Sequence, residues 1–440
     1  LKPYLTSDEA DEIEATFSNT STGMTRYSNT ITHQTMHENS SSVTFRVIKE
    51  GKIGIAGTDN ISNDGLDKAF KTALGISDRM KPTKKFPGLP EGQEYESMDT
   101  YCESTVQAGQ AGRIAGIKKV FDLAKKHDLN VAGRFKSGET EFMIANSKGV
   151  RAYQPFTFFD MSNIVMHPTF SSFSAAIGRD LSKVDFDKLA EKAVEKTVKG
   201  INPKEIDTGK YDVVLEPAAF GEVMEWLGYI GFTSKSIEEG TGFMYEKFGE
   251  KILGDNITIY DDALDTRGMS APFDFEGMPK QKVTIIDSGV AKDVVYDTYS
   301  GSKMGKKSTG HSLGARGMAH GAMPMNIYFK PGQKSLDEII SSVERGVLVT
   351  RFHYVNGFLH TPTAKMTGMT RDGLFLIEDG KIQHGLKNMR WTDNMVRILN
   401  NVAAISKEVE AIPAWWGEAG AYMLPAVHVK DFEFTGKSDH

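Results

Sequence analysis

The stretch from Val213 to Leu227 constrains the fold of this chain more than any other. It begins with Val213-Val-Leu, and β-branched and aliphatic residues of this kind are typical of a strand. Pro217 comes two positions after this run. Proline suits the first turn of a helix, because the N–H that it lacks would have no partner there. The sequence therefore predicts a strand that ends near Leu215 and runs directly into a helix.

The first half of the chain mixes strand and helix patterns. Residues 19–60 alternate polar and apolar positions, which predicts antiparallel strands with one face in water. Gly51, in Lys49-Glu-Gly-Lys, is free to take the positive φ of a hairpin turn. Helical periodicity predicts three helices, over about 64–77, 104–127 and 185–199. Further strands are expected near 131–135, 140–146 and 171–179, and an exposed loop over 81–100.

The second half is richer in strand and turn signals. Strands are expected over 257–262, 282–287, 347–354, 373–378 and 422–429. Asp287-Ser-Gly and Glu378-Asp-Gly-Lys are typical hairpin turns. One further helix is expected over about 391–408.

The length of 440 residues exceeds the usual limit for a single hydrophobic core, so two domains are expected. Asn202-Pro-Lys-Glu-Ile-Asp is typical of a linker and places the boundary near Pro203. The predicted domains are therefore 1–203 and 204–440. The pattern of elements predicts an α+β fold, with antiparallel strands and long helices in the first domain and a β-rich second domain.

Charge and cysteine content exclude several classes of function. The net charge of -6 gives no basic footprint for nucleic acid, so direct nucleic-acid binding is not expected. One cysteine, Cys102, can form neither an internal disulfide nor a cysteine zinc cluster, which favours a cytoplasmic location. No apolar run approaches the roughly 18 residues that would span a bilayer. Because the chain starts at Leu1 rather than at a methionine, we expect an initial segment to precede it.

Several segments of the second half form a specific combination in this order and spacing. They are Gly240-Thr-Gly-Phe-Met-Tyr-Glu-Lys-Phe-Gly-Glu-Lys-Ile, Asp274-Phe-Glu-Gly-Met-Pro, Ser308-Thr-Gly, Gly346-Val-Leu-Val-Thr-Arg and Thr367-Gly-Met-Thr-Arg-Asp-Gly-Leu. This combination resembles the TldD/PmbA family, which was long labelled a modulator of DNA gyrase. The resemblance implies an N-terminal α/β domain, a β-rich, barrel-like C-terminal domain, and a dimer whose subunits enclose a cavity. It also implies proteolysis of unstructured peptides by a TldD subunit paired with PmbA.

The TldD branch of this family carries His-Glu-Ala-Phe-Gly-His, or a close variant, in the helix predicted here from Pro217. In such a box the two histidines hold zinc and the glutamate activates water. Aligned on this chain, Pro217 and Glu222 take the ligand positions, and Ala218 takes the general-base position. The cysteine that supplies the third ligand in the TldD branch is also absent from residues 412–425. The resemblance therefore implies the PmbA, or TldE-like, branch, with no catalytic residue, no metal ligand and no cofactor.

The expected function is that of a non-catalytic subunit that binds unstructured peptides for a TldD-type zinc peptidase, as a heterodimer or as a homodimer. A peptide would add as a strand to a sheet edge, where backbone hydrogen bonds make few demands on sequence. Glu222 is expected to be a solvated carboxylate on the helix. The residues expected to line the peptide cavity are Ser308, Thr309, His311, Thr367, Thr370 and Arg371.

Two alternatives stay open. One is a homodimeric metallopeptidase that uses His311, His320 and Glu222, although ordinary hydrogen-bonded histidines explain the pattern more simply, as they do for His353 and His360. The other is an interaction protein that modulates a DNA-handling partner.

Two further features of the sequence do not require a catalytic or ligand-binding role. The basic stretch 301–311 does not match a phosphate-binding loop and is expected to be a flexible loop near the cavity. Trp415 and Trp416 suit either a partner surface or the core.

Overall fold

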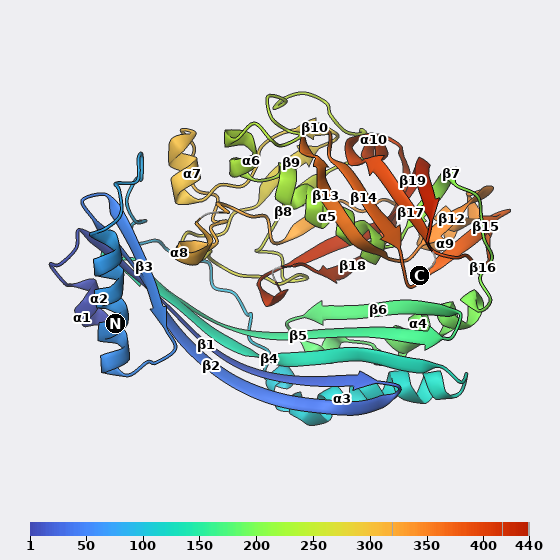
Figure 1. The fold of residues 1–440 in the computed structure, drawn as a ribbon, viewed down its shortest axis with the longest axis horizontal. Helices are drawn as coiled ribbons and strands as arrows, with labels where there is room; N and C mark the ends of the chain where they lie inside the picture. The colour runs from blue at the N-terminus through green and yellow to red at the C-terminus, as the bar shows by residue number, and fades with distance from the viewer. Residues whose placement is uncertain (319, 416, 439–440) are drawn as a thin grey trace.

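The computed structural model describes residues 1–318, 320–415 and 417–438, and it contains two β-sheets (Figure 1). The first sheet has six antiparallel strands in the order β3-β2-β1-β4-β5-β6. The second has thirteen strands and mixes parallel and antiparallel pairs. The predicted α+β class is confirmed.

The first sheet and its helices lie between residues 2 and 200. Its strands are β1 (Glu12–Ser28), β2 (Ile31–Lys49), β3 (Lys52–Thr58), β4 (Asn130–Asn146), β5 (Arg151–His167) and β6 (Phe170–Gly178). The helices are α1 (Lys2–Leu5), α2 (Asn63–Ser77), α3 (Glu103–Lys125) and α4 (Phe186–Gly200). A 3-10 turn, η1 (Leu181–Lys183), precedes α4. The three predicted helices of this half are therefore confirmed.

Local turn and cap chemistry explains where these elements begin and end. Glu50 and Gly51 take φ values of 52° and 72°, so they form the predicted hairpin turn between β2 and β3. The hydroxyl of Ser62 accepts a hydrogen bond from the backbone N–H of Gly65 and caps α2.

Strand β5 was not predicted, because Pro155 interrupts its pattern and proline cannot donate to a sheet ladder. Residue 155 lies outside the part of β5, Phe159–His167, that pairs with β6. At Pro155, β5 therefore has no strand partner on the β6 side. The N–H that proline lacks costs no hydrogen bond there, and the strand continues through the proline.

The second half supplies all strands of the larger sheet. These are β7 (Gly209–Leu215), β8 (Ile259–Asp261), β9 (Val283–Asp287), β10 (Val290–Ala291), β11 (Ile327–Phe329), β12 (Arg345–Val349), β13 (Phe352–His360), β14 (Lys365–Thr370), β15 (Leu374–Glu378), β16 (Lys381–Gly385), β17 (Met389–Asn394), β18 (Val402–Pro413) and β19 (Ala421–Lys437). The helices are α5 (Pro217–Gly231), α6 (Ser234–Glu238), α7 (Thr298–Lys303), α8 (Gly314–Gly317), α9 (Leu336–Ser341) and α10 (Met395–Asn400). Two 3-10 turns are η2 (Thr361–Thr363) and η3 (Gly417–Ala419). Both predicted hairpin turns are present, between β9 and β10 and between β15 and β16.

The larger sheet is open, so the barrel-like form expected for this half is corrected. Its main path ends at β10 on one side and at β16 on the other. The reason lies in β19, which pairs with β7, β11, β17 and β18 at different points along its length. A strand with this many partners makes the sheet branch, and within the described residues the strands do not close on themselves.

The helix predicted over 391–408 is wrong. Residues 389–394 form β17, only 395–400 are helical, and 402–413 form β18. The side-chain oxygen of Asn394 accepts from the N–H of Arg397 and starts the short helix. Trp391 fits a helical spacing in the sequence, but it is buried in the sheet against Phe352 and Phe432.

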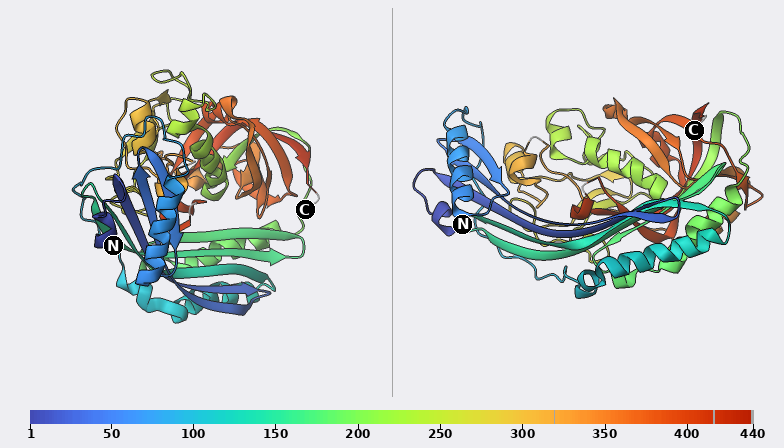
Figure 2. Two further views of the ribbon diagram at one scale, coloured as in Figure 1. Left: turned by 60° about the vertical axis from the view of Figure 1, so that its left-hand side comes forward. Right: turned by 60° about the horizontal axis from the view of Figure 1, so that its bottom comes forward.

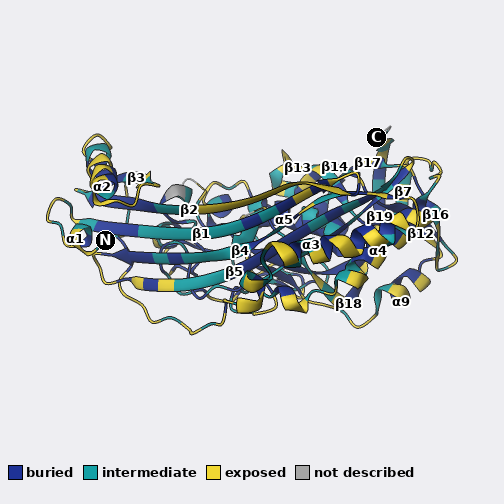
Figure 3. Ribbon diagram, turned by 90° about the horizontal axis from the view of Figure 1, so that it is seen from below, coloured by how far each residue is buried: buried dark blue, intermediate teal, exposed yellow. Residues whose placement is uncertain are grey.

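The two halves pack as layers. The long, curved first sheet runs along the second half, and α3 and α4 cover its opposite face (Figures 1 and 2). Seen from that side, the residues of α3 and α4 that face away from the sheet are exposed, as is much of β2 (Figure 3). No helix in the described part of the chain is both long and apolar enough to cross a membrane.

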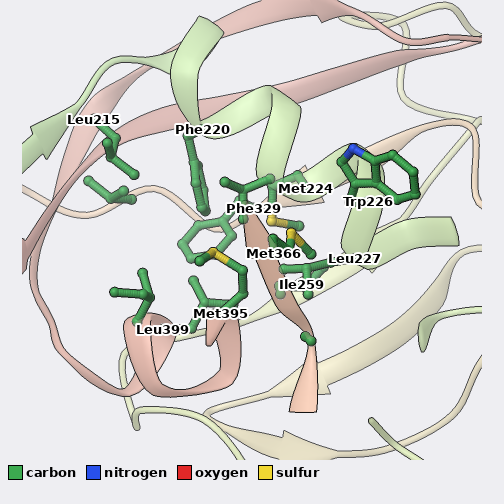
Figure 4. Packing of buried hydrophobic residues seen from close by; sticks show 14 of the residues in the cluster. Leu215, Phe220, Met224, Trp226, Leu227, Ile259, Phe329, Met366, Met395 and Leu399 are labelled. Atoms are coloured by element: carbon green, nitrogen blue, oxygen red, sulfur yellow. The ribbon is translucent and has the colours of Figure 1, made fainter. Parts of the chain in front are cut away.

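Helix α5 lies at the centre of the largest hydrophobic cluster. Phe220, Met224 and Leu227 are buried on it, and Phe220 packs edge-on against Phe329 of β11, with ring centroids 5.1 Å apart (Figure 4). The predicted strand-to-helix unit is therefore confirmed as β7 followed by α5, and it is built into the core.

Candidate functional site

The start of α5 is fixed by its neighbours on both sides. Glu216 takes an extended conformation before the helix, and Pro217 occupies the first turn. The carboxylate of Glu216 accepts hydrogen bonds from the ammonium of Lys196 on α4, at 2.6 and 2.5 Å. This partly buried ion pair attaches the strand-to-helix turn to the first half of the molecule.

The three positions of the degenerate box differ in environment. Pro217 is buried and Ala218 is half-buried, and neither side chain carries an atom that could bind a metal or take a proton. Glu222 is half-buried rather than solvated, which corrects the sequence-based expectation. Burial raises the pKa of Glu222, and the nearby charge of Arg351 opposes that rise.

This donor set does not fit zinc. A catalytic zinc site needs three protein ligands and an open position, and the box offers a single carboxylate. Across the described residues, no group of three or more His, Cys, Asp and Glu side chains is placed to hold a metal ion. No catalytic step through zinc can be derived from this arrangement.

A second carboxylate, Glu225, lies one turn further along α5 and is only 4% exposed. It accepts hydrogen bonds from the backbone N–H of Trp415 and from the hydroxyl of Tyr422, each at 3.0 Å. Burial raises the pKa of Glu225 to about 8. The hydrogen bonds from Trp415 and Tyr422 oppose this rise, and the negative charge of Glu222 adds to it. Sequence reasoning missed this residue, although an acidic residue between Met224 and Trp226 on an apolar helix was a usable sign.

Aromatic residues cover the end of α5 that carries Trp226. The rings of Phe358 and Trp415 each pack edge-on against Trp226, with centroids 4.9 Å apart. The indole N–H of Trp226 donates to the carbonyl of Val355 on β13 at 3.0 Å. Trp415 is half-exposed and packs against Trp226, while Trp416 lies outside the described residues.

Polar residues near β14 form a second group around Asp372. The carboxylate of Asp372 accepts from the guanidinium of Arg351 at 2.6 Å and from the hydroxyl of Ser171 at 2.7 Å. Arg371, the residue before Asp372, is exposed, and its backbone N–H donates to the carbonyl of Arg351 at 3.0 Å. The charge of Arg351 also opposes the rise in the pKa of Glu222, so this group lies near the degenerate box.

The two threonines expected in the same cavity are less accessible than Arg371. The hydroxyl of Thr370 is buried and accepts the backbone N–H of Met389 at 2.9 Å. Thr367 is half-buried and donates to the carbonyl of Trp391 at 2.8 Å. Both hydroxyls therefore hold neighbouring strands of the sheet.

The other predicted segment, Ser308 to His311, is held in a packed polar cluster. His311 is fully buried, and its Nε2 lies 2.9 Å from a carboxylate oxygen of Asp261. Burial, reinforced by the charge of Lys280, lowers the pKa of His311. Ser308 is buried and Thr309 half-buried, and the hydroxyl of Thr309 donates to the carbonyl of Tyr296 at 3.1 Å.

The remaining histidines do not join His311. His320 is exposed and borders a pocket with Tyr229 and Phe358, and the buried His311 is not part of that lining. His353 is half-buried, and His360 is exposed and bonded to Thr363. The ligand set of His311, His320 and Glu222 therefore does not form a single site in the described residues.

Comparison with known proteins identifies relatives over most of the chain. The family model for the PmbA/TldA metallopeptidase C-terminal domain matches residues 208–436, that for domain 1 matches 13–77, and that for the central domain matches 99–201. An uncharacterized protein of Methanocaldococcus jannaschii is 26% identical over 323 residues, 72% of each chain. Metalloprotease PmbA of Escherichia coli O157:H7 is 22% identical over 398 residues, 87% of this chain and 84% of the relative. The crystal structure of TldE from Thermococcus kodakarensis has the same fold, with a TM-score of 0.88 at 22% identity over 97% of each chain.

Proposed function

This chain belongs to the PmbA/TldD metallopeptidase family, and from that premise we propose that it is a non-catalytic, TldE-like subunit of a zinc peptidase. In this role it binds an unstructured peptide and presents it to a TldD-type subunit that carries the zinc. The relatives named metalloprotease and the fold shared with TldE support the assignment.

The observation that carries the proposal is the chemistry at the start of α5. Pro217 and Ala218 have no donor atoms, and Glu222 faces the charge of Arg351 rather than a second ligand. A lone carboxylate does not retain zinc against competing ligands. The fold of a peptidase subunit is thus kept without the groups that would activate water.

Strand β13 is the sheet edge best suited to receive an extended peptide. Among the described strands it pairs with β14 alone, so no strand occupies its other side. It runs beside α5, to which Trp226 ties it through the carbonyl of Val355. Strand addition at such an edge supplies affinity through backbone hydrogen bonds, without specific side chains. Arg371 lies next to this edge and is placed to attract acidic peptides.

Reconstitution tests the proposal. The chain alone, a TldD-type subunit with an intact His-Glu-x-x-x-His box, and an equimolar mixture are each given an unstructured peptide. We expect no cleavage by the chain alone with or without added zinc, and faster cleavage by the mixture than by the TldD-type subunit alone. Native mass spectrometry should show a complex of the two chains. Chelator-sensitive cleavage by the chain alone would support the homodimeric peptidase instead. Binding to a folded partner without peptide affinity would support the interaction protein.

A further inference from the structure

Arg113 is a buried cation that forms no ion pair with any of the described residues. Its side chain lies between α3 and the first sheet and is only 4% exposed. Nη1 donates to the hydroxyl of Ser137 at 2.9 Å, and Nε makes a longer bond of 3.4 Å to the hydroxyl of Thr25. Burial lowers the pKa of Arg113, and no neighbouring charge raises it. By contrast, the buried guanidinium of Arg46 is paired with two carboxylates.

The guanidinium of Arg113 is also only partly hydrogen-bonded. Within the described residues, its bonds are made by Nε and Nη1, which leaves Nη2 for another acceptor. The group lies directly against Gly23 of β1, where an added Cβ would come within 2.4 Å of both Nη1 and Nη2. The absence of a side chain at Gly23 therefore creates the space that the guanidinium occupies.

Helix α3 is broken at the same place. Gly109 has φ 49° and ψ -143°, so the helix stops there and a second segment runs from Gln110 to Lys125. The first N–H groups of any helical segment have no partner within it, and the positive end of its dipole favours an anion. Arg113 lies in the first turn of this second segment. The helix start and the guanidinium thus favour negative charge at the same position.

A pocket of about 390 Å³ lies over these groups. Besides Arg113 it is lined mainly by small or uncharged residues, including Ser21, Gly23, Thr35, Gly109 and Gln110. His37 also borders it, and the acidic residue in its lining, Glu139, accepts a bond from the hydroxyl of Tyr101 at 2.7 Å. The lining contains no lysine and no second arginine.

We propose that this pocket binds a carboxylate, held by the guanidinium of Arg113 and by the start of the helical segment after Gly109. One fixed positive charge matches one carboxylate, and a planar guanidinium is the protein group best suited to it. A doubly charged phosphate would lack a second cation, and Glu139 would repel it more strongly than a singly charged carboxylate. The inference goes beyond the proposed role as a peptidase subunit and does not depend on it, because binding is measured on this chain alone.

The test compares three N-acetylated tetrapeptides of glycine and alanine, titrated into the whole chain by calorimetry. One has a free C-terminal carboxylate, one is amidated, and one is amidated but carries an internal glutamate. We expect the free acid to bind at least about tenfold more tightly than the plain amide. If the glutamate peptide binds as tightly as the free acid, the site accepts an acidic side chain. If the glutamate peptide does not bind, the site is specific for a C-terminal carboxylate. No binding of either acid, or equal binding of acid and plain amide, would overturn the site.

Three variants then locate the binding. R113Q removes the charge, whereas G23A keeps it but displaces the guanidinium from the pocket, so both should lose the preference for the acid. R79Q is the control, because Arg79 is exposed and its guanidinium donates to the backbone carbonyl of Gly75. Circular dichroism checks that each variant is folded. If neither R113Q nor G23A folds, the side-chain NMR signals of Arg113 in the wild-type chain must shift with the acid and not with the amide. Unchanged selectivity in a folded R113Q would reject the assignment.

Discussion

Nη1 of Arg46 donates a 3.2 Å hydrogen bond to the carboxylate of Glu276, a residue 230 positions later in the chain. The same guanidinium lies 2.5 Å from Glu14 on the neighbouring strand β1, and all three side chains are buried. Glu276 belongs to a loop that the carboxylate of Asp274 orders by accepting the N–H groups of Glu276 and Ser312. The first sheet is thereby joined to the second half by a buried ionic contact.

Replacing Arg46 by methionine should destabilise the protein strongly, because two buried carboxylates would lose their cation. We expect R46M to lower the free energy of unfolding by about 3–5 kcal/mol, measured by chemical denaturation. The control is R267M, because the guanidinium of Arg267 is exposed in its ion pair with the half-buried Asp265, and its loss should cost about 1 kcal/mol or less. If R46M and R267M lower the free energy of unfolding equally, the buried contact of Arg46 contributes no more to stability than an exposed ion pair.

The pH dependence of stability should include a contribution from Glu225. The pKa of this residue is raised by burial from 4.5 to about 8 in the folded state. Between these values the folded chain keeps a proton that the unfolded chain releases, so stability falls as pH rises from about 4.5 to 8. E225Q has no such proton, and the loss between pH 5 and pH 8 should shrink by about 3–4 kcal/mol. Denaturation curves over this range measure it, and parallel profiles for wild type and E225Q would contradict the assignment.

Restoring the box should create zinc affinity. The variant P217H/A218E/E222H places two imidazoles and a carboxylate at the start of α5, and we expect it to bind zinc at least about tenfold more tightly than the wild type. The matched control is D67H/K68E/T72H, which places the same residues at the same spacing on the exposed face of α2. Metal content after dialysis is the measurement. Stoichiometric zinc in the wild-type chain, or equal zinc in the control, would remove the basis of the proposed function.

Arg371 should contribute to peptide binding through its charge. In the reconstituted pair we expect R371A to weaken binding of an acidic peptide by about two- to fivefold, because an exposed charge is partly screened by solvent. R345A provides the comparison, since Arg345 is also exposed but lies on β12, a strand paired on both sides. Fluorescence anisotropy of a labelled peptide gives both values. An unchanged affinity in R371A would exclude Arg371 from the peptide site.

Several features could be predicted because they depend on residues close together in the chain. The turn at Glu50 and Gly51 needs only a positive φ at two positions, and the start of α5 needs only Pro217 after a strand. The lack of donor atoms at Pro217 and Ala218 follows from residue identity alone. These are properties of one to a few neighbouring residues, so they can be recognised without knowledge of the distant contacts.

The tertiary structure decided what each charged or aromatic side chain meets. The sequence gives no sign that Arg46 is paired while Arg113 is not, because the carboxylate of Glu276 is brought in by the packing of two sheets. Trp391 was assigned to a helix from its spacing, but its neighbour Phe432 comes from a distant strand. Burial and pairing arise from segments far apart in the chain, and a local pattern does not specify which of them meet.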